Sequence, residues 1–99
     1  MTMTKELYDT IIQKRLETGP VIFTIDGIDY AMVSSYAPMY QGWASWEHNT
    51  EMIVCDRNGA MFHLTLWTDK RDYDYPTEYN YELRFFYEMG ENDSSSYFE

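Results

Sequence analysis

The residues best suited to covalent chemistry in this chain are its single cysteine, Cys55, and its two histidines, His48 and His63. Cys55 and His63 stand in neighbouring apolar segments joined by a short turn, so a hairpin would bring them together as a Cys–His pair requires. A lone cysteine between Val and Asp in an apolar segment is more typical of an inert core residue. The chain has no GxGxxG, P-loop, HExxH or CxxC pattern. The sequence therefore predicts no enzyme activity and no cofactor.

Carboxylates gather at Asp69, Asp72 and Asp74. A calcium loop places oxygen ligands at alternate positions, with a glycine for the turn and a later bidentate glutamate. This stretch has no such glycine, and Lys70 and Arg71 stand between the acids. We therefore expect a solvated acidic loop and predict no metal site.

Aromatic residues make up 18% of the chain, and Trp43 and Trp46 lie close together in one long connection. On a loop, two Trp rings make a stacking platform for a sugar or a base. The alternative is that they fold back as a lid over the sheet. We expect one of the two to act as a lid and the other to contact a partner, without distinguishing which.

The charge balance is strongly acidic, with 17 Asp and Glu against 7 Lys and Arg and a net charge of −10. Residues 69–99 hold nine acids and three bases, a net of −6, so the charge is skewed toward the C-terminal third. Such a field repels nucleic acid and anionic membranes and attracts basic surfaces. The sequence therefore predicts a basic protein surface as partner, with no direct nucleic-acid or membrane binding. Simple solubility is the alternative explanation of the charge.

The length of 99 residues fits one domain. We expect a single domain over residues 1–89 and an acidic, disordered tail over residues 90–99, because the tail is rich in Ser, Asp and Glu. No apolar run approaches the 18 or so residues of a membrane span, and the polar N-terminus does not resemble a secretory signal. These features predict a cytoplasmic protein.

The elements that would position these residues begin with a helix over residues 5–18. Thr4 is its expected N-cap, apolar residues recur with a helical period, and Gly19-Pro20 would end it. Asp26-Gly27 between two apolar runs predicts a hairpin of residues 21–25 and 28–33.

A second hairpin is predicted for residues 51–55 and 60–67 around a turn that ends in Asn58-Gly59. A fifth strand is predicted over residues 79–88, where apolar and polar residues alternate. This pattern puts Phe85 and Tyr87 on one face and Glu88 on the other. The sequence thus predicts an α+β fold, with one N-terminal helix packed on a twisted four- to five-stranded antiparallel sheet. Long connections would join the strands at residues 34–49 and 68–78.

The hairpin sequence Ile25-Asp26-Gly27-x-x-Tyr30, a Tyr- and Trp-rich connection, an acidic connection and an aromatic closing strand resemble small accessory proteins of tailed bacteriophages. Where such proteins have an assigned role, it is often inhibition of host defence, as in anti-CRISPR proteins and DNA-mimicking anti-restriction proteins. The resemblance implies an inhibitor of a nucleic-acid-handling host complex, and it transfers no individual site residue. This chain is less acidic for its size than the DNA mimics.

The leading hypothesis is a phage-encoded inhibitor that blocks such a complex through an acidic, aromatic-rich surface in the bacterial cytoplasm. The alternatives are an assembly protein that forms a homodimer, a sugar-binding module, and a small enzyme. The expected partner-binding residues are aromatic and acidic: Tyr40, Trp43, Trp46, Asp69, Asp72, Asp74, Tyr75, Glu78 and Glu82.

Overall fold

The computed structural model describes residues 1–35, 50–69 and 75–99, and over these residues the chain forms one six-stranded antiparallel sheet with short helical segments. In chain order the elements are β1 (Thr2–Met3), α1 (Lys5–Lys14), β2 (Ile22–Ile25), β3 (Ile28–Ser34), β4 (Thr50–Asp56), β5 (Ala60–Thr68), β6 (Tyr79–Glu88), α2 (Glu91–Ser95) and the 3₁₀ helix η1 (Ser96–Phe98). The strand order is β1-β6-β5-β4-β3-β2. The predicted α+β class is confirmed. The predicted strand number is too low, because Thr2 and Met3 pair with Asn80 and Tyr79 as an additional edge strand.

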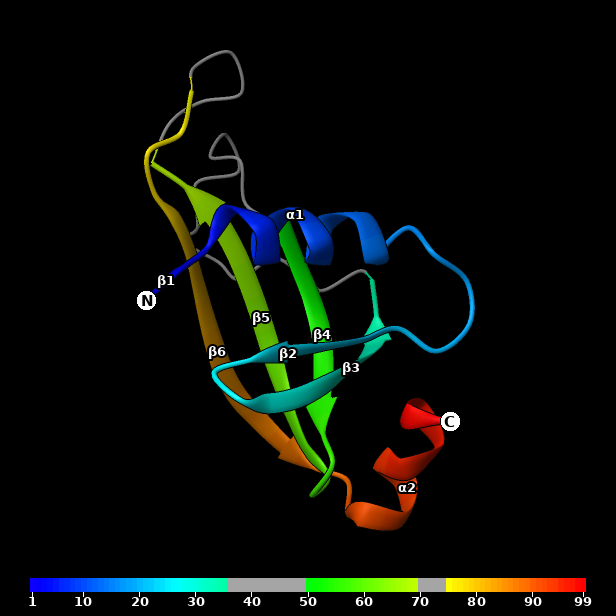
Figure 1. Cartoon of the computed structure of the whole chain (residues 1–99). Helices are drawn as coiled ribbons and strands as arrows, with labels where there is room; N and C mark the ends of the chain where they lie inside the picture. Colours follow the sequence, from blue (N-terminus) through cyan, green and yellow to red (C-terminus); the bar gives the residue numbers. More distant parts are fainter. Residues whose placement is uncertain (36–49, 70–74) are drawn as a thin grey trace.

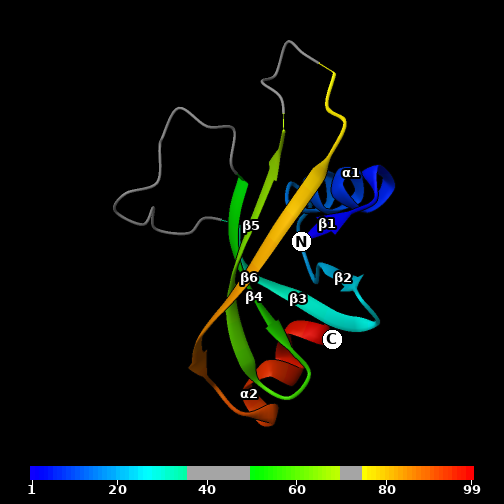
Figure 2. The ribbon, with the colours of Figure 1, turned by 90° about the vertical axis from the view of Figure 1, so that its left-hand side faces the viewer.

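The sheet is strongly curled, so that the β2–β3 hairpin crosses in front of β4, β5 and β6, with α1 lying beside it (Figure 1). The view from the side shows α1, β2 and β3 together on one side of β4 and β6 (Figure 2). One core fills the space between these layers, with Ile11 from α1, Phe23 from β2 and Leu64 from β5 buried in it. The Tyr81 hydroxyl of β6 donates a hydrogen bond to Asp26 Oδ2 at the hairpin tip, at 2.9 Å. This contact joins the tip of the β2–β3 hairpin to β6 across the curled sheet.

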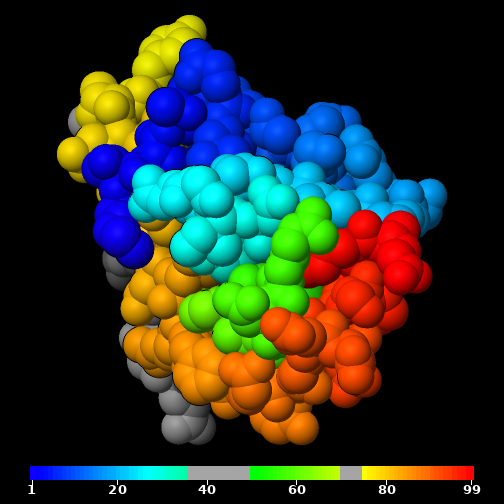
Figure 3. All heavy atoms as spheres, turned by 60° about the horizontal axis from the view of Figure 1, so that its bottom comes forward, coloured from blue at the N-terminus to red at the C-terminus, as the bar shows by residue number. Residues whose placement is uncertain are grey.

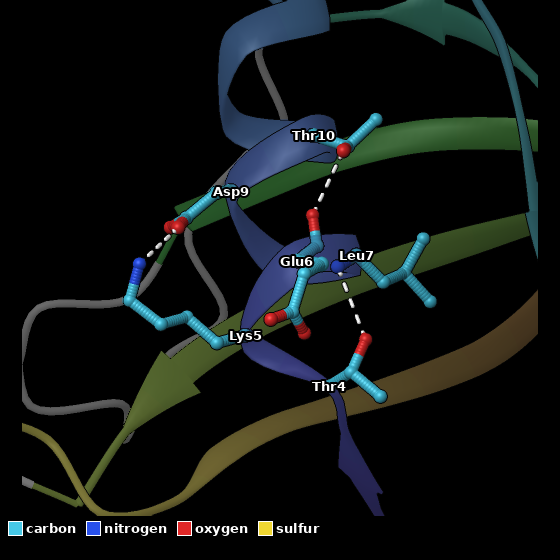
Figure 4. A network of polar contacts seen from close by, with 6 residues as sticks. All are labelled: Thr4, Lys5, Glu6, Leu7, Asp9 and Thr10. Atoms are coloured by element: carbon cyan, nitrogen blue, oxygen red, sulfur yellow. Dashed lines mark hydrogen bonds and ion pairs between the residues drawn. The ribbon is translucent and has the colours of Figure 1, made fainter.

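The N-terminus of α1 has the predicted cap (Figure 4). The Thr4 hydroxyl accepts a hydrogen bond from the Leu7 backbone N–H at 3.1 Å, which satisfies one of the free donors of the first turn. From the first residue of the helix, Lys5 forms an ion pair with Asp9 at 2.6 Å with i,i+4 spacing. The helix start is therefore fixed by local interactions that the sequence specifies.

The end of α1 differs from the prediction, because the helix stops at Lys14 instead of continuing to residue 18. The Leu16 and Glu17 N–H groups donate to the carbonyls of Gln13 and Lys14, three residues back, so the last turn tightens. Leu16 is 74% exposed and adds nothing to the core, which removes the reason to extend the helix past it.

Both predicted hairpins are present. Asp26 and Gly27 have φ values of 51° and 77°, as a tight turn of this kind requires. In the β4–β5 turn, Asp56 Oδ1 accepts hydrogen bonds from the N–H groups of Asn58 and Ala60, both at 3.0 Å. Gly59 then takes a φ of 98°.

The alternation predicted for β6 is wrong beyond Phe85, because a β-bulge interrupts the strand. Phe85 lies opposite Phe62, whereas Tyr87 lies opposite Met61, so Phe86 is the extra residue. Adjacent residues of β5 point to opposite faces, and Tyr87 therefore lies on the face opposite Phe85. The same one-residue shift places Glu88 on the same face as Phe85.

Residues 90–99 form α2 and η1 in the structure, which differs from the disordered tail that their composition predicts. Ser94 is fully buried, and its hydroxyl donates to the Arg57 carbonyl of the β4–β5 turn at 3.2 Å. The Arg57 guanidinium lies 4.3 Å from the centre of the Phe98 ring. These contacts are made with a turn that is distant in the sequence. They hold in place a segment that has little tendency to fold by itself.

Candidate interaction surface

Four of the predicted partner-binding residues lie in the described part of the chain: Asp69, Tyr75, Glu78 and Glu82. The other five, Tyr40, Trp43, Trp46, Asp72 and Asp74, lie outside it.

Asp69 directly follows β5 and binds the residues that directly precede β6. Its carboxylate accepts hydrogen bonds from the N–H groups of Thr77 and Glu78, at 2.9 and 3.0 Å, and from the Thr77 hydroxyl. These donors, the Thr77 hydroxyl first among them, lower the Asp69 pKa to about 2. Asp69 therefore has a structural role at the strand ends. Beside it, Tyr75 is 94% exposed and Glu78 is exposed, so both side chains are accessible to a partner.

The C-terminal half of β6 carries three exposed aromatic residues, Phe85, Phe86 and Tyr87, with exposed fractions of 55%, 46% and 58%. Phe85 ends a row of rings that begins in the core. The centres of the Tyr30 and Phe62 rings are 5.8 Å apart, and those of Phe62 and Phe85 are 6.0 Å apart, both in edge-on contact. The contact with Phe62 fixes the position of the Phe85 ring, and the ring nevertheless remains largely exposed to solvent.

Acidic side chains flank these rings. Residues 75–99 contain six acids and one base, Arg84, for a net of −5, whereas residues 1–35 contain five acids and three bases, for a net of −2. The only cation of that segment, Arg84, is 3.8 Å from Glu82. The end of β6 (orange) and the tail (red) lie together at the end of the molecule that Figure 3 brings forward. We call this region the β6 surface; it covers both faces of the end of β6 and comprises Glu82, Arg84, Phe85, Phe86, Tyr87, Glu88, Glu91 and Asp93.

The tail holds its acids in a fixed position at this surface. Gly59 and Gly90 approach so closely that a Cβ atom added to Gly59 would lie 2.3 Å from the Gly90 carbonyl carbon. The Met89 N–H donates to the Gly59 carbonyl at 2.8 Å. The backbone is thus anchored immediately before Glu91, the first residue of α2.

The β4–β5 register puts Cys55 opposite Met61 and His63 opposite Ile53, so the two residues of the Cys55–His63 hypothesis are not direct cross-strand partners. Cys55 is fully buried, and burial, followed by the Asp56 charge, raises its thiol pKa, so the thiolate that a nucleophile needs is disfavoured. Burial lowers the His63 pKa, and the Glu51 carboxylate opposes this from 3.8 Å. Over residues 1–35, 50–69 and 75–99, no three His, Cys, Asp or Glu side chains are arranged to hold a metal ion.

The sequence interpretation missed the aromatic triplet as a surface feature, since it placed Phe85 and Tyr87 together on one face of a regular, half-buried strand. The signal was the run Phe85-Phe86-Tyr87 itself, because three consecutive rings cannot all point inward from a strand.

Comparisons of the chain with protein families, with curated proteins and with solved structures find no match. Among the described residues, no helix has the length and apolar character needed to cross a bilayer.

Proposed function

We propose that this protein is a non-enzymatic inhibitor that binds a positively charged surface of a nucleic-acid-handling complex and blocks it. The observation that carries the proposal is the β6 surface, where Phe85, Phe86 and Tyr87 stand exposed among carboxylates. Protein interfaces combine central aromatic residues, which supply most of the binding energy, with a polar rim. The β6 surface has this composition, and its rim is acidic.

The acidic rim of the β6 surface favours a partner whose surface is positively charged. Glu82, Glu88, Glu91 and Asp93 would attract a surface rich in Lys and Arg, increase the association rate and disfavour acidic partners. Proteins that handle nucleic acid carry such surfaces, because they neutralise phosphates with the same side chains. The target implied by the resemblance of the sequence pattern to phage accessory proteins is a host defence complex in the cytoplasm of a bacterium.

Charge imitation of DNA accounts for only part of such binding. Carboxylates two residues apart on a strand are about 6.6 Å apart, because a strand rises about 3.3 Å per residue. Duplex DNA presents one charge per about 1.7 Å of its axis. The rings therefore have to supply much of the affinity, and the acids supply selectivity and speed.

Two charge-matched double variants test the proposal. Glu88→Lys with Glu91→Lys changes the β6 surface, and Glu6→Lys with Glu17→Lys changes exposed acids in and after α1. Each replacement adds two positive charges, so both variants carry a net charge of −6 instead of −10. The assay measures how well each protein displaces a labelled DNA duplex from the DNA-binding defence complexes of the host, at several salt concentrations.

We expect only the β6-surface variant to lose inhibition, and we expect the inhibition by the unmodified protein to weaken as salt rises. Equal losses in the two variants would show that net charge, and not this surface, is responsible. Full displacement by both variants would refute the proposal.

A further inference from the structure

The outer edge of β6 is paired over only a short part of its length. The strand β1 covers Tyr79 and Asn80, and Met1 exchanges backbone hydrogen bonds with Tyr81, at 2.8 Å to the Tyr81 N–H and 3.3 Å to its carbonyl. From Glu82 onward, no strand among the described residues pairs with this edge. The side chains along it are accessible, since Arg84 is 52% exposed and Tyr87 58%.

We propose that the partner contributes an extended, positively charged segment that adds to this edge as a further antiparallel strand. This inference rests on the proposed function and specifies how the β6 surface is used. Extended peptides commonly bind exposed sheet edges in this way, with backbone hydrogen bonds giving affinity and side chains giving specificity. β1 already occupies the same edge as a paired extended segment, so the edge accepts a strand in this geometry.

The register of the sheet identifies the backbone groups that would make the bonds. Tyr81 directs its N–H and carbonyl outward, to Met1. Pairing with β5 is regular from Tyr81 to Phe85, and outward groups alternate along an antiparallel strand, so Leu83 and Phe85 also direct theirs outward. The bulge at Phe86 ends this regular stretch. The edge therefore offers the N–H and carbonyl groups of two residues, followed by exposed rings.

The side chains around this edge favour cations in the added strand. Glu82 lies on one side of Leu83, and Glu88 and Glu91 follow the aromatic residues. An Arg or Lys side chain laid over Phe85 or Tyr87 would gain a cation–π interaction as well as the carboxylate charge. The protein already contains this contact between Arg57 and Phe98, at 4.3 Å.

A second copy of the chain fits the edge less well. Each copy carries a net charge of −10, so their acidic surfaces repel. A basic segment does not meet this repulsion.

Three synthetic peptides with blocked ends test the mode of binding to the full-length protein. The first alternates Arg and Val, the second alternates Glu and Val, and the third repeats the first with an N-methyl group on every backbone amide. N-methylation keeps the charge and removes the backbone donors of both edges of the peptide. We expect the Arg–Val peptide to bind at least about fivefold more tightly than its N-methylated form, the equivalent of about one hydrogen bond. We also expect it to slow amide hydrogen exchange at Leu83 and Phe85.

A pair of variants at one position provides the matched control on the protein side. Phe85→Ala removes the ring, and Phe85→Pro removes the ring and the outward N–H, while the bonds to β5 remain. We expect the Pro variant to bind the Arg–Val peptide about fivefold more weakly than the Ala variant. Circular dichroism and thermal unfolding establish that both variants are folded. If the Pro variant does not fold, the amide exchange of the unmodified protein decides.

Equal binding of the two Arg-containing peptides, with unchanged exchange at Leu83 and Phe85, would overturn strand addition and leave the proposed function intact. Equal binding of the Arg–Val and Glu–Val peptides, or of neither, would count against both. Peptide-independent dimerisation of the protein through this edge, seen by sedimentation, would also overturn the inference.

Discussion

The close approach of Gly59 and Gly90 leads to a prediction about how the C-terminal segment is attached. Replacing Gly59 with Ala puts a Cβ atom 2.3 Å from the Gly90 carbonyl carbon, where ordinary contacts begin at 3.4 Å. Gly59 and Gly90 must then separate by about 1 Å. The contacts that hold residues 90–99 would be strained or lost.

The expected magnitude has two parts. Gly59 has a φ of +98°, and an L-residue in such a conformation costs about 1 kcal/mol. Displacing the tail adds the loss of the Ser94 hydrogen bond to the Arg57 carbonyl, worth about 1 kcal/mol, and of the contact between Arg57 and Phe98, worth about 0.5–1 kcal/mol. We therefore expect Gly59→Ala to lower the free energy of unfolding by about 3 kcal/mol. Gly27→Ala, with a φ of +77° and no atom within 4 Å of the new Cβ, should cost only about 1 kcal/mol.

Urea unfolding followed by circular dichroism measures these free energies in a double-mutant cycle that includes a chain truncated after Met89. Truncation removes Gly90, so Gly59→Ala should cost about 1 kcal/mol in the shortened protein, a coupling of about 2 kcal/mol. The same cost in the full and truncated chains would refute the packing described for residues 90–99 and would support the disordered tail that their composition predicts.

Three further predictions each concern the interactions of one side chain. Thr4→Ala should lower the free energy of unfolding by about 1 kcal/mol through loss of the α1 cap, and Thr4→Ser should restore most of it. Tyr81→Phe should cost about 1 kcal/mol in thermal unfolding, and no change would exclude the bond to Asp26. The Asp69 pKa is lowered from 3.8 to about 2, so its contribution is complete above pH 3.8 and is lost as the pH falls toward 2. Asp69→Asn should therefore lose less stability than the unmodified protein over that interval, and parallel pH curves would contradict this.

The sequence predicts the parts of the fold whose causes are local. Asp26-Gly27 and Asn58-Gly59 specify turns through their own backbone preferences, and Thr4 specifies the start of α1. The end of α1 depends on whether Leu16 reaches the core, which spacing alone does not reveal. The order of residues 90–99 depends on Arg57, more than 30 residues away in the chain.

The same distinction applies to the candidate site. Composition predicts that acidic and aromatic side chains contact the partner. Tyr75, Glu78 and Glu82 are accessible, as such contacts require. The bulge at Phe86 arises from the pairing of β6 with β5, so alternation alone assigned Tyr87 to the wrong face. Asp69, expected to contact a partner, is exposed, and its carboxylate is bonded to Thr77 and Glu78.

The pairing of β1 with β6 has a practical consequence for anyone who fuses other sequences to this chain. Thr2 lies opposite Asn80 and Met1 opposite Tyr81, so a residue added before Met1 would fall opposite Glu82, and the next opposite Leu83. An N-terminal purification tag would thus run along the part of the β6 edge that no strand of the described residues pairs with, and it would act as a tethered ligand. A basic tag would compete with any partner at high effective concentration, whereas a linker with proline at alternate positions would leave the edge open.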